Sequence, residues 1–165
     1  MTKSRIDEAL ERHADVAVVG PRLVDRSGKA ELSFGDMVGP LAHIRQQRIA
    51  MGDVDAYTTR EQYPDWVTGA CLLVRRADAE AVGLLDERYF MYLEDVDFCA
   101  AIRARGRRIL FTPAVQVTHL RGRSSPTRAA SGELHRRSLI TFYQRHHPMW
   151  VPFVRLYLRL LRTDT

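Results

Sequence analysis

Apolar and polar positions alternate along the chain with two periods, one typical of helices and the other of strands. Residues 2–13 repeat apolar side chains at helical spacing and predict a helix. The apolar run 16–19 predicts a short buried strand that Gly20 and Pro21 break. Residues 22–33 predict a hairpin around a glycine-containing turn. The chain therefore opens as an α/β domain would.

The middle of the chain has weaker periodicity. Residues 34–65 contain several glycines and prolines, and they predict a long loop with helical turns around residues 41–49. Asp53 and Asp55 have the spacing of a metal-binding Asp-x-Asp pair, but no core strand precedes them, so we interpret them as part of a solvated loop. The apolar stretch 66–74 is the strongest strand prediction in the chain.

The second half alternates clear helices and strands. We expect a short helix at 77–82 stopped by Gly83, a helix at 94–105 followed by Gly106, strands at 107–111 and 115–119 around Pro113, a loop at 120–131, and helices at 132–147 and 151–162. The composition, 45% hydrophobic and 27% charged over 165 residues, is ordinary for one soluble α/β domain. We therefore predict the α/β fold class, with helices at the C-terminal end.

Cysteine usage and the chain start bear on location. Cys71 and Cys99 fit neither a disulfide framework nor a zinc site, so we expect reduced thiols. The first ten residues contain no apolar run of the kind found in a signal peptide, and no stretch is long enough to span a bilayer. These features predict a cytoplasmic protein.

Charge is unevenly distributed. Residues 121–165 carry nine arginines against two acids, a net +7, which leaves −2 for the first 120 residues. In the predicted helix at 149–165, Arg155, Arg159 and Arg162 share one face of an otherwise apolar segment. Such a basic amphipathic helix lies on an anionic membrane surface or docks on its own domain or a dimer partner, and the pattern leaves both open. No nucleic-acid-binding motif accompanies the arginines.

Three carboxylates gather where the helix at 94–105 should begin. Glu94, Asp95 and Asp97 repel one another, although a helix N-terminus favours negative charge. Simple capping charge is one interpretation. The other is a general base, because an ionised carboxylate can take a proton from a sugar hydroxyl. Aromatic residues at 89–92 precede the acids and offer a surface on which sugar rings stack.

Four short motifs occur around this cluster in a fixed order. They are Gly69-Ala70 with Arg75-Arg76, Val82-Gly83 with Asp86-Glu87 and Tyr89-Phe90, Glu94-Asp95-Val96-Asp97, and Pro113 to His119. This order resembles the acceptor-side half of inverting family 2 glycosyltransferases, the rhamnosyltransferase-like group. Leu84-Leu85 and the alanine after Pro113 depart mildly from the family pattern. The resemblance implies that residues 1–148 form the C-terminal half of a GT-A (nucleotide-diphospho-sugar transferase-like) domain, a mixed sheet flanked by helices.

The resemblance also implies roles for individual residues. Asp95 would be the catalytic base, Glu94 would assist it, and Asp97 would orient the acceptor. His119 would help to bind a divalent metal, Mn²⁺ or Mg²⁺, or the donor diphosphate. The further substrate-binding candidates are Trp66, Thr68, Gly69, Ala70 and Arg123.

The implied activity is inverting transfer of a sugar, with rhamnose as one candidate, from a nucleotide-sugar to a glycan or lipid-linked acceptor in cell-surface polysaccharide synthesis. The matching motifs lie between Asp15 and about Pro148, and we find no nucleotide-binding strand before them. We therefore expect an enzyme at the inner face of the membrane that needs an N-terminal nucleotide-binding half, on a partner chain or in a dimer. The alternative is a non-catalytic remnant of that fold that binds membrane or a partner.

Overall fold

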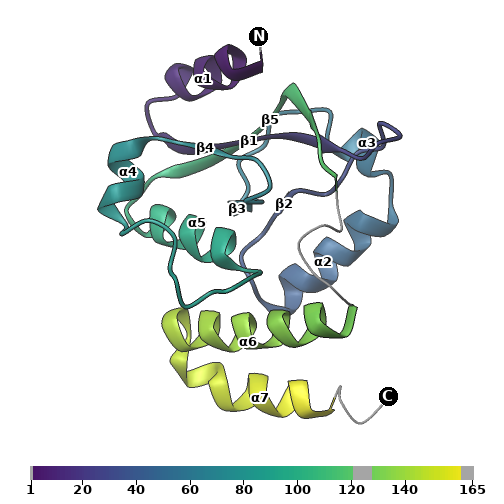
Figure 1. Ribbon diagram of the computed structural model, residues 1–165, viewed down its shortest axis with the longest axis vertical. Coiled ribbons are helices and arrows are strands. Elements are labelled where there is room, and N and C mark those ends of the chain that lie inside the picture. Colours follow the sequence, from purple (N-terminus) through teal and green to yellow (C-terminus); the bar gives the residue numbers. More distant parts are fainter. Residues whose placement is uncertain (1, 121–127, 161–165) are drawn as a thin grey trace.

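The computed structural model describes residues 2–120 and 128–160, and it has a mixed sheet flanked by helices (Figure 1). In chain order the elements are α1 (Thr2–Arg12), β1 (Val16–Val24), β2 (Phe34–Gly35), α2 (Pro40–Met51), α3 (Val54–Tyr57), β3 (Trp66–Val67), β4 (Leu73–Val74), α4 (Arg76–Ala81), α5 (Glu94–Ala104), β5 (Arg108–Thr118), α6 (Arg128–His146), the 3₁₀ turn η1 (Pro148–Trp150) and α7 (Val151–Leu160). The predicted α/β class, with helices at the C-terminal end, is confirmed.

The central strand of the main sheet is β1. It pairs in parallel with β5 and antiparallel with β4, and all but one of its residues are buried. A strand buried on both faces reads as a continuous apolar run, as Val16–Val19 does. Helix α1 packs on one side of this sheet and α5 on the other, while α6 and α7 form further layers beyond α5 (Figure 1).

The predicted break at Gly20-Pro21 is wrong. Strand β1 continues through both residues, because the register with β5 shifts immediately after Pro21. Pro21 pairs with Thr112 and Arg22 with Gln116, so residues 113–115 of β5 bulge where proline offers no N–H. The same irregularity explains why the two strands predicted around Pro113 form the single strand β5.

The strand predicted at 66–74 is also wrong as one element. Its first part, β3, pairs with β2 in a separate two-stranded sheet, and its last part, β4, pairs with β1. Residues 68–72 turn between the two sheets. An apolar run carries no internal signal for such a switch, because the pairing partners lie far away in the sequence.

The long loop predicted at 34–65 is shorter than expected, since it contains β2, α2 and α3. The solvated-loop interpretation holds for Asp53, which is exposed and lies just before α3, whereas Asp55 lies inside α3. Asp53 caps α3 by accepting a hydrogen bond from the Ala56 N–H at 2.9 Å, and Asp55 accepts one from Arg22 Nη2 at 2.7 Å. Both carboxylates therefore have structural partners.

Most helix predictions are confirmed, including α1, α4 and α5. Gly83 and Gly106 follow α4 and α5 at φ of 84° and 77°, a left-handed conformation that favours glycine at helix ends. Helix α6 begins at Arg128, inside the predicted loop. The predicted hairpin has its turn. Its arms are joined by the bridge between Val24 and Ala30 and by the Glu31 N–H, which donates to the Leu23 carbonyl at 2.9 Å. No helix among residues 2–120 and 128–160 is both long and apolar enough to cross a membrane.

The contact between β1 and β3 depends on Gly20. A Cβ added there would lie 2.7 Å from the Val67 Cβ, which is closer than carbon atoms approach. We expect Gly20→Ala to lower the free energy of unfolding by about 1–3 kcal/mol, the usual cost of overpacking a core. Urea denaturation measures this change. Gly52→Ala is the control, since its nearest neighbours lie at an ordinary 3.5 Å; equal losses in both variants would contradict the close-contact explanation.

Candidate active site

The connection into α5 has an uncommon backbone conformation. Tyr92 and Leu93 are consecutive non-glycine residues with positive φ, 70° and 65°. Each such residue costs roughly 1–2 kcal/mol relative to a right-handed conformation. Conformations of this kind persist where surrounding structure holds them, and they cluster at functional sites. Here they direct the chain into the acidic first turn of α5, which contains Glu94, Asp95 and Asp97.

The carboxylate of Asp95 is held by two backbone groups. Its Oδ2 accepts a hydrogen bond from the Gly69 N–H at 2.7 Å, and its Oδ1 accepts one from the Val96 N–H at 2.8 Å. Asp95 is half-buried, whereas Gly69 and Ala70 are exposed. Each carboxylate oxygen can accept more than one hydrogen bond, so Asp95 keeps capacity for a proton donor. This geometry suits a fixed base at the protein surface.

Gly69 lies close to Asp95. A Cβ built at this glycine would be 3.4 Å from the Asp95 Cβ, at the near limit of ordinary van der Waals contact. The neighbouring Thr68 is fixed by its N–H, which donates to the Ser33 carbonyl at 2.8 Å, and its Oγ1 is 3.4 Å from the Ala70 N. The structure thus brings Thr68, Gly69 and Ala70 together with Asp95, as the predicted site required.

Glu94 is partly buried, and the desolvation of its carboxyl costs free energy. Its Oε2 is shielded from solvent and has no hydrogen-bond partner among the described residues. Desolvation raises the pKa of this carboxyl, and the adjacent charge of Asp95 raises it further, although a backbone hydrogen bond opposes both. A buried, unsatisfied oxygen is uncommon in folded proteins. The burial of Glu94 therefore costs stability, and its predicted role beside Asp95 stays a prediction.

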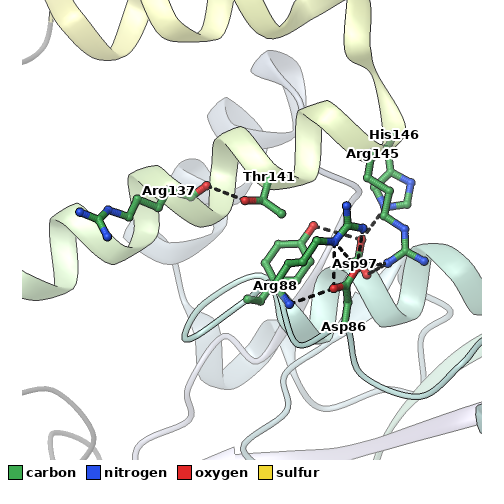
Figure 2. Close-up of polar contacts among 8 residues, drawn as sticks. Asp86, Arg88, Asp97, Arg137, Thr141, Arg145 and His146 are labelled. Atoms are coloured by element: carbon green, nitrogen blue, oxygen red, sulfur yellow. Dashed lines mark hydrogen bonds and ion pairs between the residues drawn. The ribbon is translucent and has the colours of Figure 1, made fainter.

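Asp97 is only 1% exposed, and its carboxylate points toward Arg145 and His146 (Figure 2). Its carboxylate accepts hydrogen bonds from Arg145 Nη1 at 2.6 Å and from the Tyr89 hydroxyl at 3.1 Å, and it pairs with His146 Nε2 at 2.7 Å. These partners join α5 to α6. The acceptor-orienting role predicted for Asp97 stays a prediction, while its observed contacts are internal.

A second carboxylate, Asp86, extends this network. Arg88 and Arg145 both donate to it, at 2.6 Å and 2.8 Å for the shortest contacts (Figure 2). The hydrogen bonds from Arg88 are the main reason why the pKa of Asp86 falls to about 2. Burial, followed by the charge of Asp97, raises the pKa of Tyr89. Nothing in the sequence pattern of α6 indicated that Arg145 and His146 are partners of these acids.

Trp66 lies at the edge of the site region. Its indole N–H donates to the Asp36 carbonyl at 2.8 Å, and its ring packs against two of the buried clusters. It is half-buried rather than exposed as an open pocket wall. Its predicted contact with substrate stays a prediction.

His119 lies at the end of β5 and pairs with a residue that sequence reasoning missed. Its Nδ1 is 2.9 Å from Oε2 of Glu31, which is 8% exposed. Two residues on, Ser33 holds Thr68 through its carbonyl, so residues 31–33 connect the His119 region to the loop at Gly69. No group of three His, Cys, Asp or Glu side chains with metal-binding geometry occurs in the part of the chain that the structure describes. Arg123 lies outside the described residues.

Comparison with known proteins bears on these observations. No protein-family model matches the chain. Over 96 residues, 57% of the chain, it is 38% identical to the N-acetylglucosaminyl-diphospho-decaprenol L-rhamnosyltransferase of Mycobacterium tuberculosis, in both strain CDC 1551 / Oshkosh and strain H37Rv. Over 55 residues, 33% of the chain, it is 40% identical to the rhamnosyltransferase WbbL of Escherichia coli K12. The predicted rhamnosyltransferase-like resemblance is confirmed.

The matched segments are short relative to these enzymes. They cover 31% of the mycobacterial proteins and 21% of the Escherichia coli protein. The chain thus spans about a third or less of the length of the curated relatives that it matches, and this partial coverage fits the prediction of one half of such an enzyme.

The Asp97 network should hold α6 in place. We expect Asp97→Asn to lower the free energy of unfolding by about 2–3 kcal/mol, because it removes the buried charge that pairs with Arg145 and His146 and leaves Arg145 with Asp86 alone. This estimate is below the usual cost, since 31% of the Arg145 side chain is exposed. Denaturant unfolding measures it. Arg88→Gln breaks only exposed contacts and should change little; a comparable loss in this control would contradict the assigned role.

We expect the ionised Glu94 carboxylate to lower the free energy of unfolding at neutral pH. A carboxyl whose pKa is raised by folding stabilises the folded state below its usual pKa of 4.5, and this contribution is lost as pH rises through the folded value. We therefore expect Glu94→Gln to raise the Tm at neutral pH and to have little effect near pH 4. Thermal unfolding at both pH values tests this. Glu87→Gln, at an exposed neighbouring carboxylate, is the control; a Tm gain that is the same at both pH values would disprove the desolvation argument.

Proposed function

We propose that the chain forms the acceptor-side half of an inverting family 2 glycosyltransferase with a GT-A fold. It would transfer a sugar, with rhamnose the first candidate, from a nucleotide-sugar to a hydroxyl of a lipid-linked glycan in cell-surface polysaccharide synthesis. The observation that carries the proposal is the Asp95 carboxylate, held by the Gly69 N–H at 2.7 Å beside an exposed small-residue loop. The rhamnosyltransferase names of the relatives support the sugar and the acceptor class.

In this proposal Asp95 acts as the general base. One carboxylate oxygen takes the proton of the acceptor hydroxyl, and the hydroxyl oxygen attacks the anomeric carbon of the donor. The bond from that carbon to the diphosphate oxygen breaks, and its electron pair leaves with the nucleoside diphosphate. Attack on the face opposite the leaving group inverts the anomeric configuration. The Gly69 and Val96 N–H groups keep the base oriented, so little reorganisation is needed at the moment of transfer.

The surroundings of Asp95 suit an acceptor sugar. Residues 68–70 carry small side chains and two of them are exposed, which allows a substrate close to the backbone. Phe90, on the connection before α5, is 83% exposed and offers a flat apolar surface on which a sugar ring can stack. Acceptor recognition is therefore assigned to the loop at Gly69 and the aromatic connection, and not to the internally paired Asp97.

Donor binding is assigned to a nucleotide-binding half outside these 165 residues, in a longer chain or in a partner, at the cytoplasmic face of the membrane. A divalent metal, Mn²⁺ or Mg²⁺, is part of the proposal through His119. The described residues fit it only in part, because Glu31 and His119 form a pair without a third ligand group. No step of the proposed transfer is therefore routed through the metal.

The base assignment is tested with Asp95→Asn. The amide oxygen still accepts from the Gly69 N–H, so the fold should be retained, but the side chain no longer takes a proton. We expect the transfer rate to fall about 10²- to 10⁴-fold, the usual contribution of general-base catalysis. The measurement is transfer from dTDP-rhamnose to N-acetylglucosaminyl-diphospho-decaprenol, with Glu80→Gln as an exposed-carboxylate control. Full transfer by Asp95→Asn would rule out this residue as the base.

Calorimetric titration with dTDP- and UDP-sugars, with and without Mn²⁺, distinguishes the proposed enzyme from the alternative, a non-catalytic module. Metal-dependent binding by the chain alone would indicate a donor site in this half and would contradict the assignment of donor binding to another half. Absence of both binding and transfer in the chain combined with a nucleotide-binding half would favour a non-catalytic module derived from the same fold.

A further inference from the structure

Helix α7 has three distinct faces. Val151, Val154 and Leu158 are half-buried and recur at i, i+3 and i+7, so they form the side that packs against α6. The rest of the helix surface is exposed, and α7 forms the outermost layer of the fold on the far side of α6 (Figure 1). What covers this outer surface decides the role of the helix.

The outer surface carries an apolar stripe. Phe153, Leu156, Tyr157 and Leu160, which we call the α7 stripe, recur at i, i+3, i+4 and i+7 and are 53–64% exposed. In an α-helix these positions fall within one arc about 100° wide. Just before the helix, Met149 and Trp150 are 85% and 59% exposed and add to the apolar surface. Exposed apolar side chains gathered in this way mark a contact surface rather than chance exposure.

Arginine borders the stripe on one side. Arg155 and Arg159 are exposed and stand one helical turn apart, between the stripe and the face that packs on α6. Residues 149–160 contain no acidic side chain, and neither arginine forms an ion pair among the described residues. Like charges at this spacing slightly destabilise a helix. An anionic partner outside the described chain would turn this cost into a gain.

We propose that the α7 stripe and its two arginines dock on an anionic lipid surface, with the helix axis parallel to the membrane plane. The apolar side chains would enter the acyl boundary, while Arg155 and Arg159 reach the head groups. Trp150 and Tyr157 are of the types that favour the membrane interface. The ten described residues of α7 extend about 15 Å, half the thickness of the hydrocarbon core, a length that suits a helix lying on the membrane.

A second copy of the chain fits this surface less well. Two copies related by a twofold axis through α7 would bring equivalent patches together. Arg155 and Arg159 would then lie near the same arginines of the partner, with no acid on α7 to compensate them. An anionic lipid surface matches both the apolar and the charged part of the patch.

The proposal does not depend on the role of Asp95. If both hold, α6 links the two sites, because it packs against α7 and binds Asp97 of α5 through Arg145 and His146. The base would then stand at a fixed height above the membrane, where the head of a lipid-linked acceptor lies.

Vesicle cosedimentation tests the docking surface. The wild-type chain should bind vesicles of phosphatidylcholine mixed with phosphatidylglycerol, and binding should weaken as salt screens the charges. Arg155→Gln with Arg159→Gln should reduce the affinity roughly tenfold or more. Leu156→Asp should abolish binding, and Phe153→Ser, a milder change on the same stripe, should weaken it. The matched controls are Leu41→Asp, at a residue 82% exposed on α2, and Arg76→Gln, at an exposed arginine of α4.

Tryptophan fluorescence locates the contact. Vesicles should shift the emission to shorter wavelength in the wild type and in Trp66→Phe, but not in Trp150→Phe. The proposal is overturned if the stripe variants bind as well as the controls, or if phosphatidylcholine alone binds equally well. A third result would also overturn it: the wild type does not bind vesicles, and light scattering shows a dimer that Leu156→Asp converts to a monomer. The α7 stripe would then be a protein interface.

Discussion

The parallel pairing of β1 with β5 is the constraint on which the rest of the structure depends. Parallel neighbours cannot be joined by a tight turn, so a long crossover must connect them. Here the crossover contains the loop at Gly69 and the start of α5, and β4 returns within it to pair with the other edge of β1. The sheet thereby fixes both segments that meet at Asp95. Loss of this pairing would separate Asp95 from the loop whose Gly69 N–H holds its carboxylate.

The three acids in the first turn of α5 would repel one another, but helix geometry gives each of them different surroundings. Successive residues point about 100° apart, so Glu94, Asp95 and Asp97 have different surroundings. Asp97 points inward and is neutralised by α6, Asp95 meets the Gly69 N–H, and Glu94 is partly buried with one unsatisfied oxygen. A buried ion pair contributes little net stability but penalises every arrangement that separates its partners. Asp97 therefore fixes where α6 lies more than how firmly the domain folds.

The sequence correctly predicted the features that depend on residues close together in the chain, such as helix ends. Gly83 and Gly106 marked helix ends, because a left-handed residue after a helix favours glycine. The wrong predictions concern strands whose pairing partners are distant in the sequence. Pro21 remains inside β1 because β5 bulges opposite it, and residues 66–74 divide between two sheets whose other strands are remote. At the site, the motif pattern identified Asp95 with Gly69, whereas Glu31 beside His119 and Arg145 beside Asp97 had no local signature.

Departures from ordinary folding rules gather around Asp95. Tyr92 and Leu93 adopt positive φ, and Glu94 carries an unsatisfied buried oxygen. Each departure costs free energy, and all three residues lie within three positions of Asp95 in the sequence. Natural sequences are locally consistent except where function requires otherwise. Unfavourable features close to one oriented carboxylate are what a functional site would require, and the segment in which they occur belongs to a chain that is similar to rhamnosyltransferases.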